Sequence, residues 1–272
     1  MSIKSSVTIS IVEEARGGPF VFHEDFLLGC QKAADLGFDA VELFAPGPDA
    51  ISASKINTII GDLGLGLAAV GTGAGMVIHQ YSLSDSDDLK RQKAVDFARS
   101  MIDLGADFGA PAIVGSMQGN SEPNEEKEEA VRRLTDSMQK LGEHADSQGV
   151  ALLLEPINRY ESNLINTVGA ACDLINNQAS DSLRVMADLF HMNIEEIDIA
   201  EALVSTGKLV GHVHFADSNR SAVGMGHTEM APIAAALKDI DFDGYLSAEI
   251  FPKPDGDTAA AQTKKSFDTY FG

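Results

Sequence analysis

The chain has 272 residues, with 41 Asp or Glu against 20 Lys or Arg, so its formal net charge at pH 7 is -21. This charge repels phosphate backbones and anionic bilayers, which argues against nucleic-acid and membrane partners and favours a small substrate. Because 44% of the residues are hydrophobic, the chain can bury a substantial core, and we expect a soluble globular protein.

Short runs of β-forming residues alternate along the chain with longer amphipathic stretches. The stretches at 87–105, 124–149 and 167–178 have helical periodicity and end at Gly or at a polar turn, as helices often do. Eight such units predict the α/β class and a (β/α)8 TIM barrel, and the lack of a Pro/Ser-rich linker favours a single domain over residues 1–272. The predicted strands are 6–12, 39–44, 66–71, 111–116, 150–155, 184–188, 209–215 and 244–251.

Acidic or imidazole side chains stand at the C-terminal ends of the last four predicted strands. They are Glu155, Asp188, His214 and Glu249. In a TIM barrel these strand ends meet at one mouth, and side-chain alternation aims all four residues inward. Any one acid could simply begin a loop, but carboxylate and imidazole groups at four equivalent positions predict a site for a divalent ion.

Three residues in the loops after predicted strands five to seven are candidates for substrate binding. Glu161 offers a second carboxylate, His191 can donate a hydrogen bond to a substrate oxygen, and Arg220 carries a permanent positive charge. Their neighbours Asn158 and Arg159 could instead be loop scaffold. The mouth is therefore expected to combine an ion site with groups that bind oxygen atoms.

Other polar positions allow two interpretations. Glu42 and Gln118 could reach substrate hydroxyls or make ordinary loop hydrogen bonds. His212 lies one layer deeper than the predicted ligand of its strand, and we interpret it as a supporting group. The sequence GTGAG at 71–75 lacks the spacing of a dinucleotide-binding loop and no obvious helix follows it, so we interpret it as an active-site loop.

Both cysteines of the chain, Cys30 and Cys172, lie in apolar helical contexts. The N-terminal sequence shows neither a charged segment followed by an apolar one nor a long apolar span. These features indicate a reduced protein in the cytoplasm.

Three segments and a closing tetrapeptide resemble the ketose 3-epimerases of the xylose isomerase-like barrel superfamily, the group of D-tagatose and D-psicose 3-epimerases. The resemblance spans most of the chain and is strongest from residue 150 to 251. Departures from the usual pattern are Val223, where many relatives carry proline, and Glu229, where aspartate is common. The segments are EPINRYE (155–161), DLFHMNIEE (188–196), HVHFADSNR (212–220) and AEIF (248–251).

The resemblance implies a role for seven residues and a xylose isomerase-like fold. One divalent ion, usually manganese with magnesium or cobalt as alternatives, would be bound by Glu155, Asp188, His214 and Glu249. Substrate oxygens would be held by Glu161, His191 and Arg220. Homo-oligomers are common in this family, so a dimer or tetramer is expected.

These groups suit proton abstraction next to a carbonyl. Epimerisation at C3 of a ketose needs a base on one face and an acid on the other, and Glu155 and Glu249 can flank the reacting carbon. We therefore predict an isomerase, a metal-dependent epimerase acting on a free ketose or keto-sugar acid through a cis-enediolate.

Other functions stay open. An aldose–ketose isomerase, similar to hydroxypyruvate isomerase, would use the same ion and carboxylates, and an inosose dehydratase would eliminate water from a similar enediolate. A sugar-binding barrel with a structural ion would not need both flanking glutamates. An apurinic-site endonuclease shares the barrel but needs a basic DNA surface, against which the net charge argues.

Overall fold

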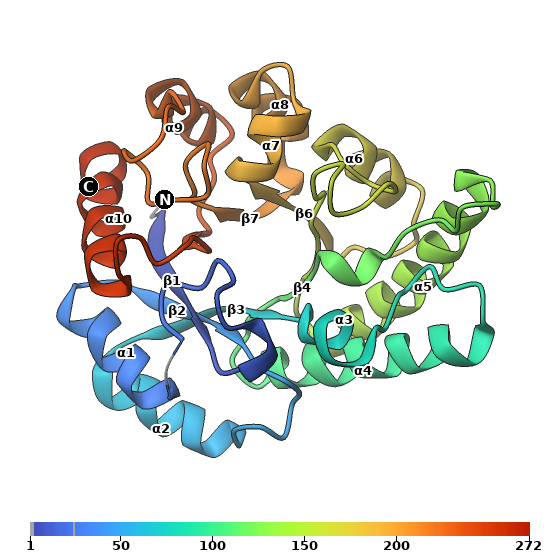
Figure 1. Ribbon diagram of the computed structural model, residues 1–272, viewed down its shortest axis with the longest axis horizontal. Coiled ribbons are helices and arrows are strands. Elements are labelled where there is room, and N and C mark those ends of the chain that lie inside the picture. The colour runs from blue at the N-terminus through green and yellow to red at the C-terminus, as the bar shows by residue number, and fades with distance from the viewer. Residues whose placement is uncertain (1–2, 24) are drawn as a thin grey trace.

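The computed structural model describes residues 3–23 and 25–272 of the chain. Its parallel strands pair in sequence order and close into a barrel, with β8 paired to β1, and the helices surround the strands (Figure 1). The predicted α/β class and (β/α)8 TIM barrel are confirmed. The strands are β1 (Lys4–Ser10), β2 (Ala40–Phe44), β3 (Gly66–Gly71), β4 (Ala112–Val114), β5 (Leu152–Leu154), β6 (Leu183–Asp188), β7 (Val210–His214) and β8 (Tyr245–Ala248).

Local sequence explains where many helices begin and end. Asp87 and Thr167 accept backbone N–H groups from the first turns of α4 and α6, while Gly64 and Gly149 end α2 and α5 in the left-handed conformation. The helices are α1 (Phe26–Asp35), α2 (Ala53–Leu63), α3 (Ala74–His79), α4 (Asp88–Ala106), α5 (Lys127–Gln148), α6 (Val168–Asn176), α7 (Leu189–Glu195), α8 (Ile199–Thr206), α9 (Met230–Asp239) and α10 (Gly256–Phe271). Short 3-10 helices are η1 (Glu13–Ala15), η2 (Ser116–Gln118) and η3 (Gly207–Leu209).

Several predicted strand boundaries are wrong, β4 and β5 being shorter than predicted, and the first and last strands differ at the barrel mouth. β1 begins and ends two residues earlier than the predicted 6–12, because the chain turns at Val12 into η1. The last strand stops at Ala248 instead of residue 251, because the N–H of Glu249 bonds back to the carbonyl of Ser247 at 3.2 Å. This turn matters for the site, since it lies directly at the barrel mouth.

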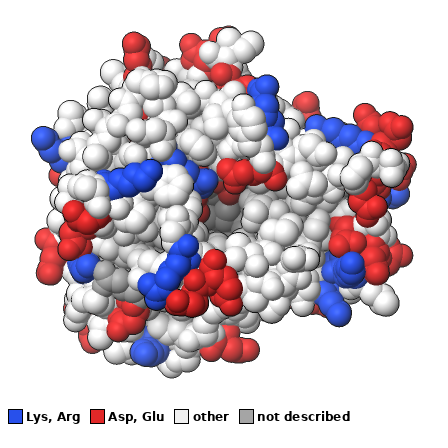
Figure 2. All heavy atoms as spheres, viewed as in Figure 1, with Lys and Arg blue, Asp and Glu red and all other residues white. Residues whose placement is uncertain are grey.

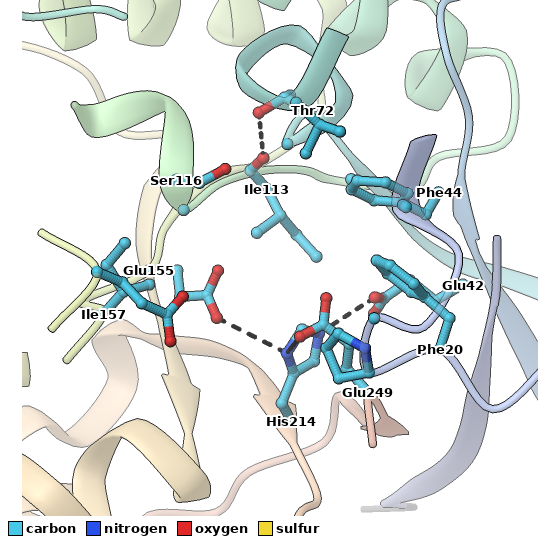
Figure 3. Close-up of a pocket in the computed structure, with 18 of the residues that line it drawn as sticks. Phe20, Glu42, Phe44, Thr72, Ile113, Ser116, Glu155, Ile157, His214 and Glu249 are labelled. Atoms are coloured by element: carbon cyan, nitrogen blue, oxygen red, sulfur yellow. Dashed lines mark hydrogen bonds and ion pairs between the residues drawn. The ribbon is translucent and has the colours of Figure 1, made fainter. Parts of the chain in front are cut away.

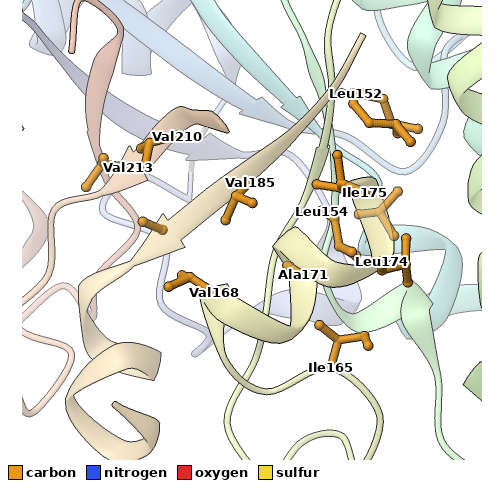
Figure 4. Close-up of a cluster of buried hydrophobic side chains, with 14 of the residues drawn as sticks. Leu152, Leu154, Ile165, Val168, Ala171, Leu174, Ile175, Val185, Val210 and Val213 are labelled. Carbon is orange, nitrogen blue, oxygen red and sulfur yellow. The ribbon is translucent and has the colours of Figure 1, made fainter. Parts of the chain in front are cut away.

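Alternating side chains divide each strand between the barrel interior and the helices. Leu153 and Met186 belong to a small apolar cluster inside the barrel, together with alanine and isoleucine side chains of β3 and β4. Their neighbours Leu152, Leu154 and Val185 point outward and pack with the buried face of α6 (Figure 4). The predicted inward aim of the β5 and β6 positions is therefore confirmed by packing.

The barrel interior is polar on the side of β1, β2, β7 and β8. Buried side chains there are Ser6, Thr8, Glu42, His212 and Ser247. Strand register places them beside one another, since Ser6 pairs with Ser247 and Thr8 pairs with Glu42. This half of the interior therefore places polar groups directly beneath the mouth.

The molecular face shown in Figure 2 is hollowed near its centre, and acidic side chains lie beside the hollow. The hollow lies over the barrel seen in the same view in Figure 1. In the part of the chain that the structure describes, no helix is both long enough and apolar enough to span a bilayer.

Candidate active site

A cavity of about 450 Å³ opens at the C-terminal ends of the strands (Figure 3). Aromatic and aliphatic side chains form much of its wall, including Phe20 and Phe44, whose rings stack with centroids 4.5 Å apart. Its polar lining includes Glu155, Glu161, His191, His214, Arg220 and Glu249. Nearly all residues predicted for ion and substrate binding therefore border one space.

The other three predicted ion ligands converge on the imidazole of His214. Its Nδ1 atom lies 3.3 Å from Oδ2 of Asp188, 3.6 Å from Oε2 of Glu249 and 3.7 Å from Oε1 of Glu155. Neighbouring ligands of an octahedral divalent ion, with bonds of 2.0–2.1 Å, lie about 3 Å apart. The donor atoms already lie close to that separation, and their chemistry suits a hard or borderline divalent ion.

The site is short of positive charge. Burial raises the pKa of Glu155 well above its usual value, and the negative charges of Glu249 and Asp188 raise it further, although His214 opposes both. A bound divalent cation would supply the missing positive charge and favour the ionised carboxylates. This charge deficit is a second observation that fits an ion at this position.

The two oxygens of Asp188 have different partners, one at the start of α7 and one at His214. Its Oδ1 atom accepts backbone N–H groups from Phe190 at 2.8 Å and from His191 at 3.4 Å, which caps the first turn of α7. Its Oδ2 atom faces His214. The expectation that His191 lies in a loop is wrong, because this cap starts α7 directly after β6 and places His191 in the helix's first turn.

His191 is held with one ring nitrogen as an acceptor. Its Nδ1 accepts the backbone N–H of Asn158 at 3.2 Å and lies 2.8 Å from the side-chain Nδ2, which is fixed because Asn158 Oδ1 accepts the N–H of Tyr160. Burial lowers the pKa of His191 although Asp188 opposes this, so the ring is neutral and carries its proton on Nε2. That nitrogen lies 3.9 Å from Oε1 of Glu155 and can donate, but it cannot bind an ion while protonated.

Arg220 reaches the same group of carboxylates. Its Nη2 atom bonds Glu249 and lies 3.7 Å from Oδ2 of Asp188, while Nη1 lies 3.7 Å from Oε1 of Glu161. The guanidinium also lies over the ring of Phe190, 5.0 Å from its centroid. The backbone of Arg220 has φ of 56°, a strained conformation for a residue other than glycine, and the surrounding loop must hold it.

Asp217 organises that loop. Its Oδ1 accepts the N–H groups of Ser218 and Thr228 at 2.7 and 3.0 Å, and its Oδ2 accepts those of Gly224 and Gly226 at 2.8 and 2.9 Å. The backbone carbonyl of Asp217 accepts the N–H of Arg220 at 2.8 Å. Sequence reasoning did not identify this role, because the four donors are spread along the loop and only its folded path brings them together.

Glu42 lines the cavity, and of its two open interpretations the structure favours hydrogen bonding to protein groups. Its Oε2 lies 2.8 Å from Nε2 of His212, and its Oε1 lies 3.1 Å from Nε2 of His214 and 3.3 Å from Oγ1 of Thr8. The interpretation of His212 as a supporting group agrees with this geometry. The signal in the sequence was an acidic residue near the end of a buried strand, which does not reveal the partner.

Gln118 and Arg159 are scaffold. Gln118 donates from Nε2 to the carbonyl of Glu155 at 3.2 Å and accepts the N–H of Ile165 at 2.9 Å, which ties two loops together. Arg159 pairs with Glu195 at 2.9 Å on the outside of the mouth. Both residues therefore hold loops in place, and neither is assigned a contact with substrate.

Two glycine-containing segments shape the cavity. A Cβ atom built at Gly115 would lie 2.1 Å from Oε2 of Glu155, so this glycine leaves room for the carboxylate, a role that sequence reasoning missed. Gly71, Thr72 and Gly73 line the cavity, as expected of an active-site loop. The expectation that no helix follows them is wrong, because backbone bonds from residues 75 and 76 to 72 and 73 start α3.

Comparison with known proteins gives consistent results. A sequence model of the family described as xylose isomerase-like TIM barrel matches residues 30–270. An L-ribulose 3-epimerase from Mesorhizobium japonicum is 31% identical over 221 residues, which cover 80% of this chain and 72% of that protein. A D-psicose 3-epimerase from Agrobacterium fabrum is 28% identical over 250 residues, with 89% and 82% covered. The crystal structure of D-psicose 3-epimerase with D-tagatose from Clostridium cellulolyticum H10 has the same fold, with a TM-score of 0.82, 24% identity and 99% of each chain covered.

Proposed function

The chain belongs to the xylose isomerase-like TIM barrel family and, within it, to the ketose 3-epimerases, and from this premise we propose that it is an isomerase that inverts C3 of a free ketose. The observation that carries the proposal is the approach of Glu155 and Glu249, from the ends of β5 and β8, to the same His214 nitrogen inside the cavity. Two carboxylates beside one ion site are what proton removal and return at one carbon require.

The ion site would take one divalent ion, Mn²⁺ by preference, with Mg²⁺ or Co²⁺ as alternatives. When bound, the ion would polarise the ketose carbonyl as a Lewis acid. Its ligands would be Glu155, Asp188, His214 and Glu249. These residues suit a divalent ion by the chemistry of their donor atoms, by the distances between those atoms and by the site's deficit of positive charge.

Glu155 and Glu249 would carry the proton on opposite faces of C3. One carboxylate removes the C3 proton, the C–H electron pair forms the C2–C3 double bond of a cis-enediolate, and the carbonyl π electrons move onto O2. The other carboxyl group then gives a proton to the opposite face of C3, which restores the C2 carbonyl and inverts the centre. Either glutamate acts first, depending on the direction of the reaction.

His191, Arg220 and Glu161 would hold substrate oxygens. His191 presents Nε2–H and Arg220 presents guanidinium N–H groups toward the carboxylate cluster, so both can donate to oxygens whose negative charge grows as the enediolate forms. Glu161 lies 3.7 Å from Arg220 and accepts a bond from Asn158 at 2.8 Å, which suits it to orient a hydroxyl.

A single-domain chain, a homo-oligomer, and a cytoplasmic location stay predictions.

The test is exchange of substrate hydrogens with solvent. The metal-free protein is loaded with Mn²⁺ and incubated in deuterium oxide with fructose, psicose, tagatose, sorbose or ribulose, and product and deuterium are located by NMR after the ion is removed. We expect deuterium at C3 together with the C3 epimer, and loss of both in Glu155→Gln and Glu249→Gln. Deuterium at C1 with aldose formation would replace the proposal by an aldose–ketose isomerase. No exchange with any ketose would refute it and direct the search to inososes and keto-sugar acids.

A further inference from the structure

Glu42 is a deeply buried carboxylate in the lining of the cavity. Only 2% of its surface is exposed, and both oxygens face donors, with His212 at Oε2 and with His214 and Thr8 at Oε1. A buried carboxylate of this kind is retained only when its partners satisfy it.

Glu42 and the three predicted carboxylate ligands contact opposite nitrogens of the His214 ring. Nε2 lies 3.1 Å from Glu42, while Nδ1 on the other side of the ring lies within 3.7 Å of Asp188, Glu155 and Glu249. A proton on Nε2, donated to Glu42, leaves the lone pair of Nδ1 directed at the ion site. Figure 3 shows the same ring with contacts on both sides, to Glu42 and to Glu155.

Two other roles for Glu42 fit less well. Contact with a substrate hydroxyl would need a carboxylate that is open to the cavity, and only 2% of Glu42 is exposed. A second ion held by Glu42, His212 and His214 would need an unprotonated Nε2 on both rings. The proton of His214 would then sit on Nδ1, among the three carboxylates, and the first ion would lose its nitrogen ligand.

We propose that Glu42 is a positioning residue, which accepts Nε2–H of His214 and thereby directs Nδ1 to the divalent ion, while His212 holds Glu42 in place. The proposal rests on the proposed function only for the presence of the ion. Partners of this kind orient a ligating histidine and raise its basicity, and their loss weakens metal binding by about 10- to 100-fold.

The first test measures ion binding by the metal-free protein. Mn²⁺ is titrated and the free ion is read by electron paramagnetic resonance, for the wild type, Glu42→Gln and Thr8→Val. A glutamine can still accept from His214, but it is uncharged and no longer raises the basicity of that imidazole, so we expect the Kd for Mn²⁺ to rise about 10- to 100-fold. Thr8→Val removes only the longest contact to the same carboxylate, at 3.3 Å, and should change the Kd by less than about threefold. One ion per chain is expected in all three.

Thermal unfolding of the three metal-free proteins separates positioning from folding. A Glu42→Gln variant with a near-native Tm and an unchanged Kd would overturn the proposal, and so would two ions per chain in the wild type. A wild type that binds one Mn²⁺ but exchanges no ketose would refute the proposed function and leave the role of Glu42 intact.

A second test uses only the wild type, so it holds even where Glu42→Gln fails to fold. The protein is labelled with histidine carrying ¹⁵N at Nδ1 alone, loaded with Mn²⁺, and examined by pulsed electron paramagnetic resonance. The strong hyperfine coupling between Mn²⁺ and the directly bound nitrogen should be that of a ¹⁵N nucleus instead of ¹⁴N. An unchanged ¹⁴N coupling would show ligation through Nε2, which is incompatible with the bond to Glu42, and would overturn the proposal.

Discussion

Replacing Asp217 with asparagine should weaken the loop that carries Arg220. The native carboxylate is 1% exposed and accepts four backbone N–H groups, two on each oxygen. An asparagine has one oxygen and one NH₂ group. Whichever way the amide turns, it meets two of the four N–H groups with a donor, and those two hydrogen bonds are lost.

The size of the effect follows from the two lost bonds. Hydrogen bonds to a charged group contribute about 1.5–3 kcal/mol each, so we expect Asp217→Asn to lower the free energy of unfolding by about 3 kcal/mol or more. Because the same loop holds Arg220 in its strained conformation, kcat/KM for ketose exchange should fall as well. Urea unfolding measures the first quantity and deuterium exchange into the ketose measures the second.

The stability difference should depend on pH in one direction. Burial would raise the pKa of Asp217, but the backbone hydrogen bonds outweigh it and lower the pKa below its usual value. A carboxylate with a lowered folded-state pKa stabilises the fold above its unfolded pKa of about 3.9, and this contribution disappears as the pH falls through the folded value. The difference between wild type and Asp217→Asn should be constant near neutral pH and shrink below about pH 4.

The matched control is Asp255→Asn. Asp255 also accepts a backbone N–H, from Thr258 at 2.8 Å, but it caps α10 at the surface. Its replacement should cost far less stability and leave ketose exchange unchanged. Equal losses in the two variants, or a stability difference for Asp217→Asn that grows as the pH falls below 4, would refute this account of the loop.

Three further changes test other parts of the site. Gly115→Ala places a Cβ 2.1 Å from the Glu155 carboxylate, so kcat should fall by about 100-fold, and a near-native rate would show that the carboxylate can move without loss. Asn158→Ala removes the side-chain donor at His191 while the backbone donor remains. We expect kcat/KM to drop about 10-fold and the Kd for Mn²⁺ to stay unchanged. Weaker binding of Mn²⁺ would contradict the assignment of His191 as a substrate-binding residue. Glu229 precedes α9 without a side-chain cap, so Glu229→Asp should raise the stability by about 0.5–1 kcal/mol in urea unfolding, and a loss would count against capping there.

The convergence of the four proposed ion ligands was predictable from the sequence, because in a TIM barrel the order of the strands along the chain fixes their positions in space. Glu155, Asp188, His214 and Glu249 each lie at or just after the end of a strand, and strand ends in a closed parallel barrel meet whatever the intervening helices contain. Their convergence therefore needs no knowledge of side-chain contacts. The ends of the first and last strands, near Val12 and Ala248, were harder to predict, because a β-forming pattern does not show where the backbone turns away from the neighbouring strand.

The supporting residues were not predictable in the same way. Asp217 and Asn158 act through backbone N–H groups of loops, and those donors come together only after the loop path is set. Glu42 pairs with histidines from β7, whose neighbours in the barrel are β6 and β8. Its contacts therefore cross the barrel interior, where side-chain length and rotamer decide which atoms meet.

The three histidines near the mouth show why residue type alone cannot assign a role. His214, His212 and His191 all lie in polar, buried surroundings, and each ring could bind an ion or donate a proton. The group behind each ring makes the difference. Glu42 accepts Nε2–H of His214 and leaves Nδ1 for an ion, whereas the backbone N–H of Asn158 uses the lone pair of His191 Nδ1 and leaves a proton on Nε2. One carboxylate and one amide, both remote in sequence from the ring they contact, thus give neighbouring imidazoles opposite chemistry.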